Sequence, residues 1–262
     1  MTSYTTIKYE KKNQVGYATF SRPEIHNAFN STLIREMLHL FSEIEKDADL
    51  RLVVLTGEGK SFCAGADLNW MRSVINQTFE ENLAESHELA ELLHKVYSCK
   101  KPVIGRINGA AIGGGTGFVA VCDIAIASKL AKFSFSEVKI GIVPACIGPY
   151  VVKKMGEGKA RELFITGERM NADRAFEVGL VNKVVEHDQL DAEVEKLISL
   201  VLSSGPEAVG VAKKLVSEVP GMPPDEYKPY TAEMIARLRL SDEGQEGMDA
   251  FLNKRPPKWV KE

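Results

Sequence analysis

The chain has 262 residues, of which 44% are hydrophobic and 26% are charged, a composition typical of a folded globular protein. Its formal net charge of −3 and its pI near 6.0 argue against binding to nucleic acid or to an anionic membrane surface. The nearest approach to a membrane span is Gly109 to Ala127, but its glycines and Asp123 indicate a buried core segment instead.

The N-terminus has neither the apolar core of a secretion signal nor the arginines of a transit peptide, so we expect a cytoplasmic protein. The cysteines form no C-x-x-C pair and have no companion histidine spacing. We therefore expect reduced thiols, not disulfides or zinc ligands. These cysteines are Cys63, Cys99, Cys122 and Cys146.

The first half of the chain alternates predicted helices with predicted strands. Apolar residues recur at helical spacing from Phe29 to Ile44, with charged residues on the other face and Asn30 available as a cap. A second helix is expected at residues 79–97 and is ended by Lys101-Pro102. Strands are expected at residues 51–56, 103–107, 124–128 and 132–135.

In the second half the predicted strands become rare, and they stop after about residue 188. Short helices are expected at residues 160–165 and 172–178, followed by a strand at 180–185. Amphipathic helices are then expected at residues 191–202, 206–217, 225–240 and 245–254. We therefore expect an α/β core over residues 1–190 and a helical region over residues 191–262.

Two loops of small residues follow predicted strands and lead into plausible helices. They are Ser61–Asp67 and Gly109–Gly117. Small residues allow a ligand to approach the backbone closely, and the first turn of a helix leaves amide N–H groups without partners. Two such loops facing one another would form a pocket of donors for an oxygen that gains negative charge during a reaction.

These loops and several further motifs resemble the crotonase family, the enoyl-CoA hydratases and isomerases, in the family's order along almost the whole chain. The motifs are Arg22-Pro23, Asn27-Ala28, Ser61–Leu68, Asn108–Gly115, Cys122–Ile124, Phe133–Glu137, Gly141–Pro144 and Glu246–Arg255. The resemblance implies a spiral of ββα turns with a helical C-terminal region for trimerisation. It also implies a homotrimer, or a homohexamer built from two trimers.

The resemblance implies catalytic roles for three residues. The amides of Ala66 and Gly114 match the pair that holds the thioester carbonyl oxygen, where enolate charge develops. Glu137 matches the family's proton-transfer glutamate, and an apolar acyl pocket would raise its pKa. Asp67, directly after the first loop, is better explained as a helix cap than as an acid.

The resemblance also implies an acyl-CoA thioester substrate, with no metal and no redox cofactor, since coenzyme A arrives with the substrate. Phe251 and Lys254 could reach coenzyme A bound to a neighbouring subunit, or Lys254 could be a solvated helix end. The other residues expected to bind substrate or coenzyme A are Asn27, Ala28, Ala64, Gly65, Ala66, Asp67, Leu68, Gly113 and Gly114.

Gly117 departs from the family's best-known hydratases, which carry a second, water-activating glutamate at this position. Isomerases of the family work with the carboxylate that matches Glu137 alone. However, Asp67–Arg72 and Ser136–Ala145 resemble bacterial methylglutaconyl-CoA hydratases, which also have glycine there. A distal carboxylate of such a substrate could occupy the space that Gly117 leaves, with Arg106 as a cation near it; otherwise Arg106 is a strand-edge residue facing solvent.

We therefore expect a hydratase acting on a 2-enoyl-CoA in fatty-acid or branched-chain amino-acid breakdown. The alternatives are a Δ3,Δ2-enoyl-CoA isomerase and a non-catalytic acyl-CoA-binding homologue. A dinucleotide fingerprint at Gly115–Ala120 is disfavoured because the segment reaches the next strand too quickly for a full crossover helix. RNA binding, known for one relative, is disfavoured by the acidic pI.

Overall fold

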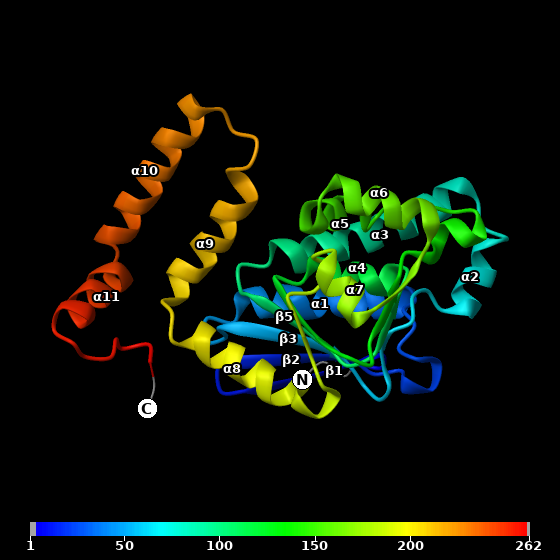
Figure 1. Ribbon diagram of the computed structural model, residues 1–262, viewed down its shortest axis with the longest axis horizontal. Helices are drawn as coiled ribbons and strands as arrows, with labels where there is room; N and C mark the ends of the chain where they lie inside the picture. The colour runs from blue at the N-terminus through cyan, green and yellow to red at the C-terminus, as the bar shows by residue number, and fades with distance from the viewer. Residues whose placement is uncertain (1–3, 261–262) are drawn as a thin grey trace. The chain divides into compact units, whose positions relative to one another are not determined.

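The computed structural model describes residues 4–260 and contains two compact units. Of the described residues, the N-terminal unit comprises 4–99 together with 103–194, and the C-terminal unit comprises 100–102 together with 195–260 (Figure 1). None of the helices within residues 4–260 combines the length and the apolarity needed to cross a bilayer.

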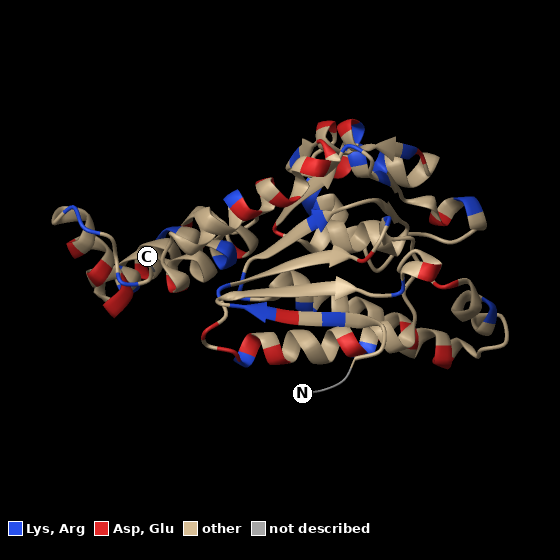
Figure 2. Ribbon diagram, turned by 90° about the horizontal axis from the view of Figure 1, so that it is seen from below, with Lys and Arg blue, Asp and Glu red and all other residues tan. Residues whose placement is uncertain are grey.

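The N-terminal unit opens with a hairpin that the sequence pattern did not predict. Strands β1 (Ile7–Lys12) and β2 (Val15–Phe20) pair antiparallel, and Asn13 has the left-handed conformation, φ 54°, in the turn between them. β1 is the edge of the larger sheet and is mostly exposed, which explains its charged sequence. Figure 2 shows these charges on β1, whereas β2 carries none.

Two sheets are built by a repeated path of the chain. From β3 to β8, each turn of the path adds one strand to a six-stranded sheet and the next strand to a four-stranded sheet. The larger sheet has the order β1-β2-β3-β5-β7-β10, and its first four strands lie next to one another in Figure 1. The smaller sheet has the order β4-β6-β8-β9. This is the predicted α/β organisation, a spiral of ββα turns.

The strands that follow the hairpin are short, and from β2 to β8 neighbouring strands are parallel, while β8 and β9 are antiparallel. The larger sheet takes β3 (Leu52–Gly57), β5 (Val103–Ile107), β7 (Ile124–Ser128) and β10 (Lys183–Val185). The smaller sheet takes β4 (Ser61–Cys63), β6 (Ala110–Ile112), β8 (Lys132–Ser134) and β9 (Arg169–Asn171).

Helix α1 (Ser31–Lys46) shows how the sequence directs packing in this unit. The side chain of Asn30 accepts a hydrogen bond from the Leu33 amide and caps the helix, as expected. Apolar residues on one face, among them Leu33, Met37 and Phe41, are buried in the core beside the larger sheet. The remaining helices of the unit are α2 (Leu68–Val74), α3 (Phe79–Ser98), α4 (Gly114–Val121), α5 (Gly148–Met155), α6 (Glu157–Thr166) and α7 (Ala172–Glu177).

The C-terminal unit is helical. Helix α8 (Leu190–Leu202) begins in the N-terminal unit and continues into this one. It is followed by α9 (Pro206–Glu218), α10 (Pro224–Leu240) and α11 (Asp242–Leu252). The helices expected at 206–217 and 225–240 therefore occur within one residue of the expected bounds, and the helix expected at 245–254 lies two to three residues earlier.

Candidate active site

The two small-residue loops lie against each other, backbone to backbone. Their strands β4 and β6 are parallel neighbours in the smaller sheet. A Cβ atom added to Gly109 would lie 1.9 Å from the Lys60 carbonyl oxygen, and one added to Gly115 would lie 2.0 Å from that of Cys63. Only glycine permits such contacts, so these glycines bring the two loops together.

The direction of the Ala66 amide is fixed by a single parallel bridge between Phe29 and Ala66. The Phe29 amide donates to the Gly65 carbonyl oxygen at 2.8 Å, and the Asp67 amide donates to the Phe29 carbonyl oxygen at 2.8 Å. In a trans peptide the C=O and the N–H point in opposite directions. Because the Gly65 C=O points toward Phe29, the Ala66 N–H points away from it and is available to a ligand.

The Gly114 amide is the second donor. Gly114 is the first residue of α4, so its N–H has no carbonyl one turn earlier in the helix. The preceding residue, Gly113, has φ 54° and ψ −126°, a conformation that favours glycine. A Cβ atom on Gly114 would lie 2.7 Å from the ring of Phe29. Both donors are therefore adjacent to the same buried phenylalanine.

Glu137 brings a carboxyl group to this site from the 3₁₀ turn Ser136–Ile140. Its Oε1 lies 3.2 Å from the position that a Cβ atom on Gly113 would occupy. Its Oε2 is buried and has no hydrogen-bond partner among residues 4–260. Burial raises the pKa of this carboxyl. The carboxyl lies beside Gly113, the residue before the Gly114 donor. It is therefore placed to exchange a proton with a molecule bound at that donor.

The space beside Gly117 is filled. A Cβ atom at this position would lie only 2.1 Å from Cγ2 of Ile147, which is 2% exposed. The expectation that Gly117 leaves room for a substrate carboxylate is therefore wrong. A side chain from the segment just before α5 occupies the volume that a larger residue at position 117 would need.

Arg106 has partners within the protein. Its Nε donates to Oδ1 of Asp191 at 2.5 Å, and its Nη1 donates to Oγ1 of Thr56 at 3.4 Å. The hydrogen bond from Arg106 lowers the pKa of the Asp191 carboxyl. This pairing contradicts the suggestion that Arg106 is held as a cation for a substrate carboxylate.

The segment before α1 is tied to the first loop. Asn27 is fully buried and donates from Nδ2 to the carbonyl oxygens of Glu58 and Ser61, at 2.9 and 2.8 Å. The Ala64 amide donates to the His26 carbonyl oxygen at 3.0 Å. The side chain of Asn27 therefore holds the loop in place. Leu68, at the start of α2, is 70% exposed.

Asp67 is the cap of α2, which confirms the helix-cap interpretation. Its Oδ1 accepts a hydrogen bond from the Asn69 amide at 2.8 Å, and its Oδ2 pairs with Nη2 of Arg22 at 2.7 Å. Burial raises the pKa of the Asp67 carboxyl, but the hydrogen bonds from Asn69 and Arg22 outweigh this effect and lower it. The sequence did not reveal the pairing with Arg22.

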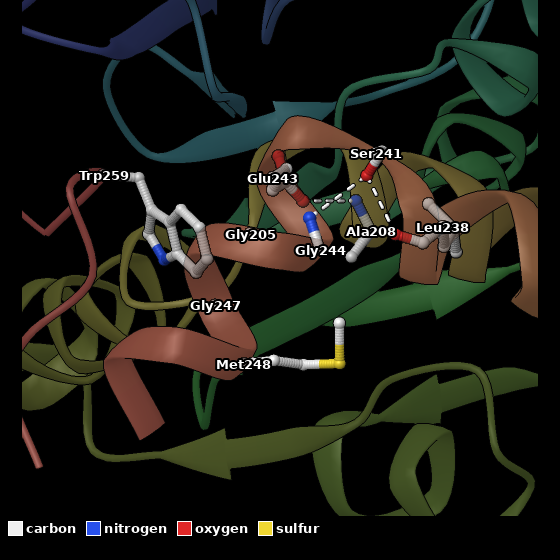
Figure 3. Close-up of a pocket in the computed structure, with 9 residues that line it drawn as sticks. All are labelled: Gly205, Ala208, Leu238, Ser241, Glu243, Gly244, Gly247, Met248 and Trp259. Carbon is white, nitrogen blue, oxygen red and sulfur yellow. Dashed lines mark hydrogen bonds between the residues drawn. The ribbon is translucent and has the colours of Figure 1, made fainter. Parts of the chain in front are cut away.

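The C-terminal unit contains a cavity of about 260 Å³ between its own helices (Figure 3). One carboxylate, that of Glu243, lies beside it and accepts hydrogen bonds from the Glu207 and Ala208 amides at the start of α9, each at 2.8 Å. This carboxylate therefore caps a helix. Phe251 lies in the same unit and is 83% exposed, and Lys254 has φ 53°.

Two small-residue loops on neighbouring parallel strands and a carboxyl group whose Oε2 has no hydrogen-bond partner among residues 4–260 thus lie together in this ββα spiral. The sequence matches the family Enoyl-CoA hydratase/isomerase over residues 10–262, and the chain belongs to this family. The family resemblance is thereby confirmed.

Relatives with named activities are similar over nearly their whole length. A short-chain-enoyl-CoA hydratase of Clostridium acetobutylicum is 35% identical over 252 residues, 94% of each chain. A crotonyl-CoA hydratase of Syntrophomonas wolfei is 34% identical over 264 residues, covering 98% of this chain and 99% of that one. The crystal structure of an enoyl-CoA hydratase from Shewanella pealeana superposes with a TM-score of 0.94 at 38% identity, covering 97% and 96% of the two chains. The predicted crotonase fold is confirmed.

Proposed function

We propose that this protein is an enoyl-CoA hydratase that adds water to a 2-enoyl-CoA thioester. The observation that carries the proposal is the carboxyl of Glu137, whose Oε2 is buried without a hydrogen-bond partner among residues 4–260 and whose Oε1 lies beside Gly113, next to the Gly114 amide at the start of α4. The named activities of the Clostridium acetobutylicum and Syntrophomonas wolfei relatives support the same reaction. The Ala66 and Gly114 amides form the oxyanion hole.

The proposed reaction uses one carboxylate twice. Glu137 removes a proton from water as the water oxygen bonds to C3 of the enoyl group. The electron pair of the C2=C3 bond moves toward the thioester, and enolate charge develops on the carbonyl oxygen, where the two amides stabilise it. Glu137 then returns the proton to C2, which regenerates the carboxylate and completes the addition. Removing one oxyanion donor from other enzymes lowers the rate by about 10²–10³-fold.

The remaining expectations are part of the proposal. The reaction needs no metal and no redox cofactor, because coenzyme A arrives as part of the substrate, and the protein works in the cytoplasm. Coenzyme A contacts Asn27, Ala28, Ala64, Gly65 and Leu68, and it meets Asn27 through the backbone because the side chain of Asn27 is committed to the loop. In an oligomer, Phe251 and Lys254 of a neighbouring subunit complete this contact.

An isomerase is the second candidate, and one observation favours it. Glu137 is the carboxyl group at the site, and Ile147 fills the space where a second one would project from position 117. A single carboxylate suffices to remove a proton from C2 of a 3-enoyl-CoA and to return it to C4. This relay shifts the double bond and requires no activated water.

Product analysis separates these reactions. Crotonyl-CoA, 3-hexenoyl-CoA and 3-methylglutaconyl-CoA are incubated separately with the enzyme, and the products are identified by mass spectrometry and NMR. A hydratase forms 3-hydroxyacyl-CoA from crotonyl-CoA. Efficient conversion of 3-hexenoyl-CoA to 2-hexenoyl-CoA without hydration of the other substrates would make the protein an isomerase. Preferred hydration of 3-methylglutaconyl-CoA would identify the dicarboxylic substrate that the sequence resemblance suggested.

Replacing Glu137 tests the mechanism directly. We expect Glu137→Gln to lower kcat by about 10²-fold or more, the usual scale for loss of a general acid–base group. Binding of a saturated acyl-CoA should change little, because glutamine has nearly the same volume. The control is Glu157→Gln, whose side chain is 74% exposed on α6. Near-normal turnover of Glu137→Gln would contradict the proposed role.

A further inference from the structure

The guanidinium of Arg22 binds two partners at once, and the proposed reaction does not use this contact directly. Its Nη2 pairs with Oδ2 of Asp67 at 2.7 Å, and its Nη1 donates to the carbonyl oxygen of Ala28 at 2.6 Å. The ion pair is largely shielded, with side-chain exposures of 16% for Arg22 and 10% for Asp67. An arginine fork in a partly buried place holds both partners in a fixed geometry.

The two partners of Arg22 flank the bridge that orients the Ala66 donor. Ala28 precedes Phe29, and Asp67 follows Ala66, so the guanidinium connects the two backbone segments on either side of the Phe29–Ala66 pair. That pair stands outside the named strands and consists of two backbone hydrogen bonds. Without extended pairing on either side, a bridge of this kind needs further contacts to keep its register.

Arg22 is itself held by its own segment. Its amide donates to Oδ1 of Asn27 at 2.9 Å, and the Asn27 amide donates to the Arg22 carbonyl oxygen at 2.9 Å. The same Asn27 side chain holds the carbonyl oxygens of Glu58 and Ser61. The Arg22 guanidinium therefore links a backbone segment that Asn27 holds in place to Asp67, the residue directly after Ala66.

We propose that Arg22 is a positioning residue for the reaction: it fixes the direction of the Ala66 N–H, and so the strength of the oxyanion hole, by joining Ala28 to Asp67. The proposal rests on the proposed function, because it assigns a role to the geometry of that donor. Arg22 acts through Asp67 and the backbone and does not touch the substrate. A misplacement of about 1 Å at a catalytic group lowers rates by about 10²-fold in other enzymes.

Two substitutions separate charge from geometry. Arg22→Lys keeps the positive charge but has no planar fork, so one nitrogen atom must serve both Asp67 and the Ala28 carbonyl, without the fixed geometry of the two guanidinium nitrogens. Arg22→Met keeps much of the side-chain volume and removes both contacts. The matched control is Arg106→Met, which breaks another arginine–aspartate pair of the N-terminal unit away from this loop.

The informative measurement is the infrared C=O stretch of butanoyl-CoA, labelled with ¹³C at the thioester carbon and bound to each variant. Strong hydrogen bonds to the carbonyl oxygen lower this frequency, so the band reports the donors rather than overall stability. With crotonyl-CoA we expect Arg22→Met to lower kcat by about 10- to 100-fold, with KM changed by less than about threefold. Its carbonyl band should return toward that of free butanoyl-CoA. Arg22→Lys should fall between Arg22→Met and the wild type, and Arg106→Met should match the wild type.

The outcomes distinguish this proposal from the proposed function. A wild-type band at the frequency of free butanoyl-CoA would overturn the oxyanion hole itself. A shifted wild-type band that Arg22→Lys and Arg22→Met both retain would overturn the positioning role alone. If Arg106→Met changed the carbonyl band by the same amount, the change would reflect general loosening of the N-terminal unit. The positioning role of Arg22 would then be overturned. If Arg22→Met does not fold, Arg22→Lys decides, because it retains the charge.

Discussion

Glu137 shows how a single residue can be favourable for reaction and unfavourable for folding. Its Oε2 is buried and has no hydrogen-bond partner among residues 4–260. Burial disfavours the charged form and raises the pKa above the usual value of 4.5. In the folded state the carboxyl therefore holds its proton to higher pH than in the unfolded chain. Its contribution to stability is present below the unfolded pKa and is lost as the pH rises through the folded pKa.

The raised pKa of Glu137 predicts that the stabilities of Glu137→Gln and the wild type differ by an amount that depends on pH. The free energy of unfolding of Glu137→Gln, minus that of the wild type, should increase as the pH is raised from about 4 to about 8. Glutamine cannot ionise, so the variant avoids the burial of a charge at the higher pH. Urea denaturation of both proteins across this range measures the difference. A difference that is constant or that falls with pH would show that burial does not dominate the environment of Glu137.

Gly117 gives a second prediction for a single residue. A Cβ atom here would lie 2.1 Å from Cγ2 of Ile147, so we expect Gly117→Ala to destabilise the protein by about 1–3 kcal/mol through overpacking. In the background Ile147→Ala the same substitution should be much less harmful, because the clashing atoms are gone. A double-mutant cycle of unfolding free energies measures this coupling. Additive effects of the two substitutions would contradict the contact.

The residues of the site differ in how far sequence could predict them. The cap at Asp67 was predictable because its partner, the Asn69 amide, lies two residues away. Ile147 against Gly117 and Arg22 against Asp67 were not predictable, because each pair joins segments that only the complete fold brings together. The carboxyl of Glu137 was identified from its motif, whereas its burial and its missing hydrogen-bond partner required the structure.

The helices of this protein could be predicted from the sequence more accurately than the strands. The long helices α1 and α3 have enough turns to show a periodic apolar face, and their expected bounds were close to the observed ones. Strands β4, β6 and β9 have three residues each, too few to display alternation. The hairpin β1–β2 was missed because the exposed edge strand is mostly charged, which hides its strand pattern.

At the scale of the whole molecule, the helical C-terminal unit carries large apolar side chains on its surface. Leu240 on α10 is 81% exposed, and Phe251 and Leu252 on α11 are 83% and 77% exposed. Exposed apolar side chains that form a large continuous patch mark association surfaces. We expect trimers or hexamers in solution, which light scattering at micromolar concentration measures directly. The paired variant Phe251→Glu/Leu252→Glu should shift the mass downward, and a monomeric wild type would contradict the expectation.

The contacts of Gly109 and Gly115 with the facing backbone have a consequence for inherited variation in this protein. Apart from proline, which removes the N–H, no exchange of one side chain for another deletes a main-chain donor; it can only displace it. At these glycines, serine, valine and aspartate would all be harmful, because each brings a Cβ atom within about 2 Å of a carbonyl oxygen. Variants at these two glycines should therefore be ranked by the volume they add, and the polarity of the new side chain should matter little there.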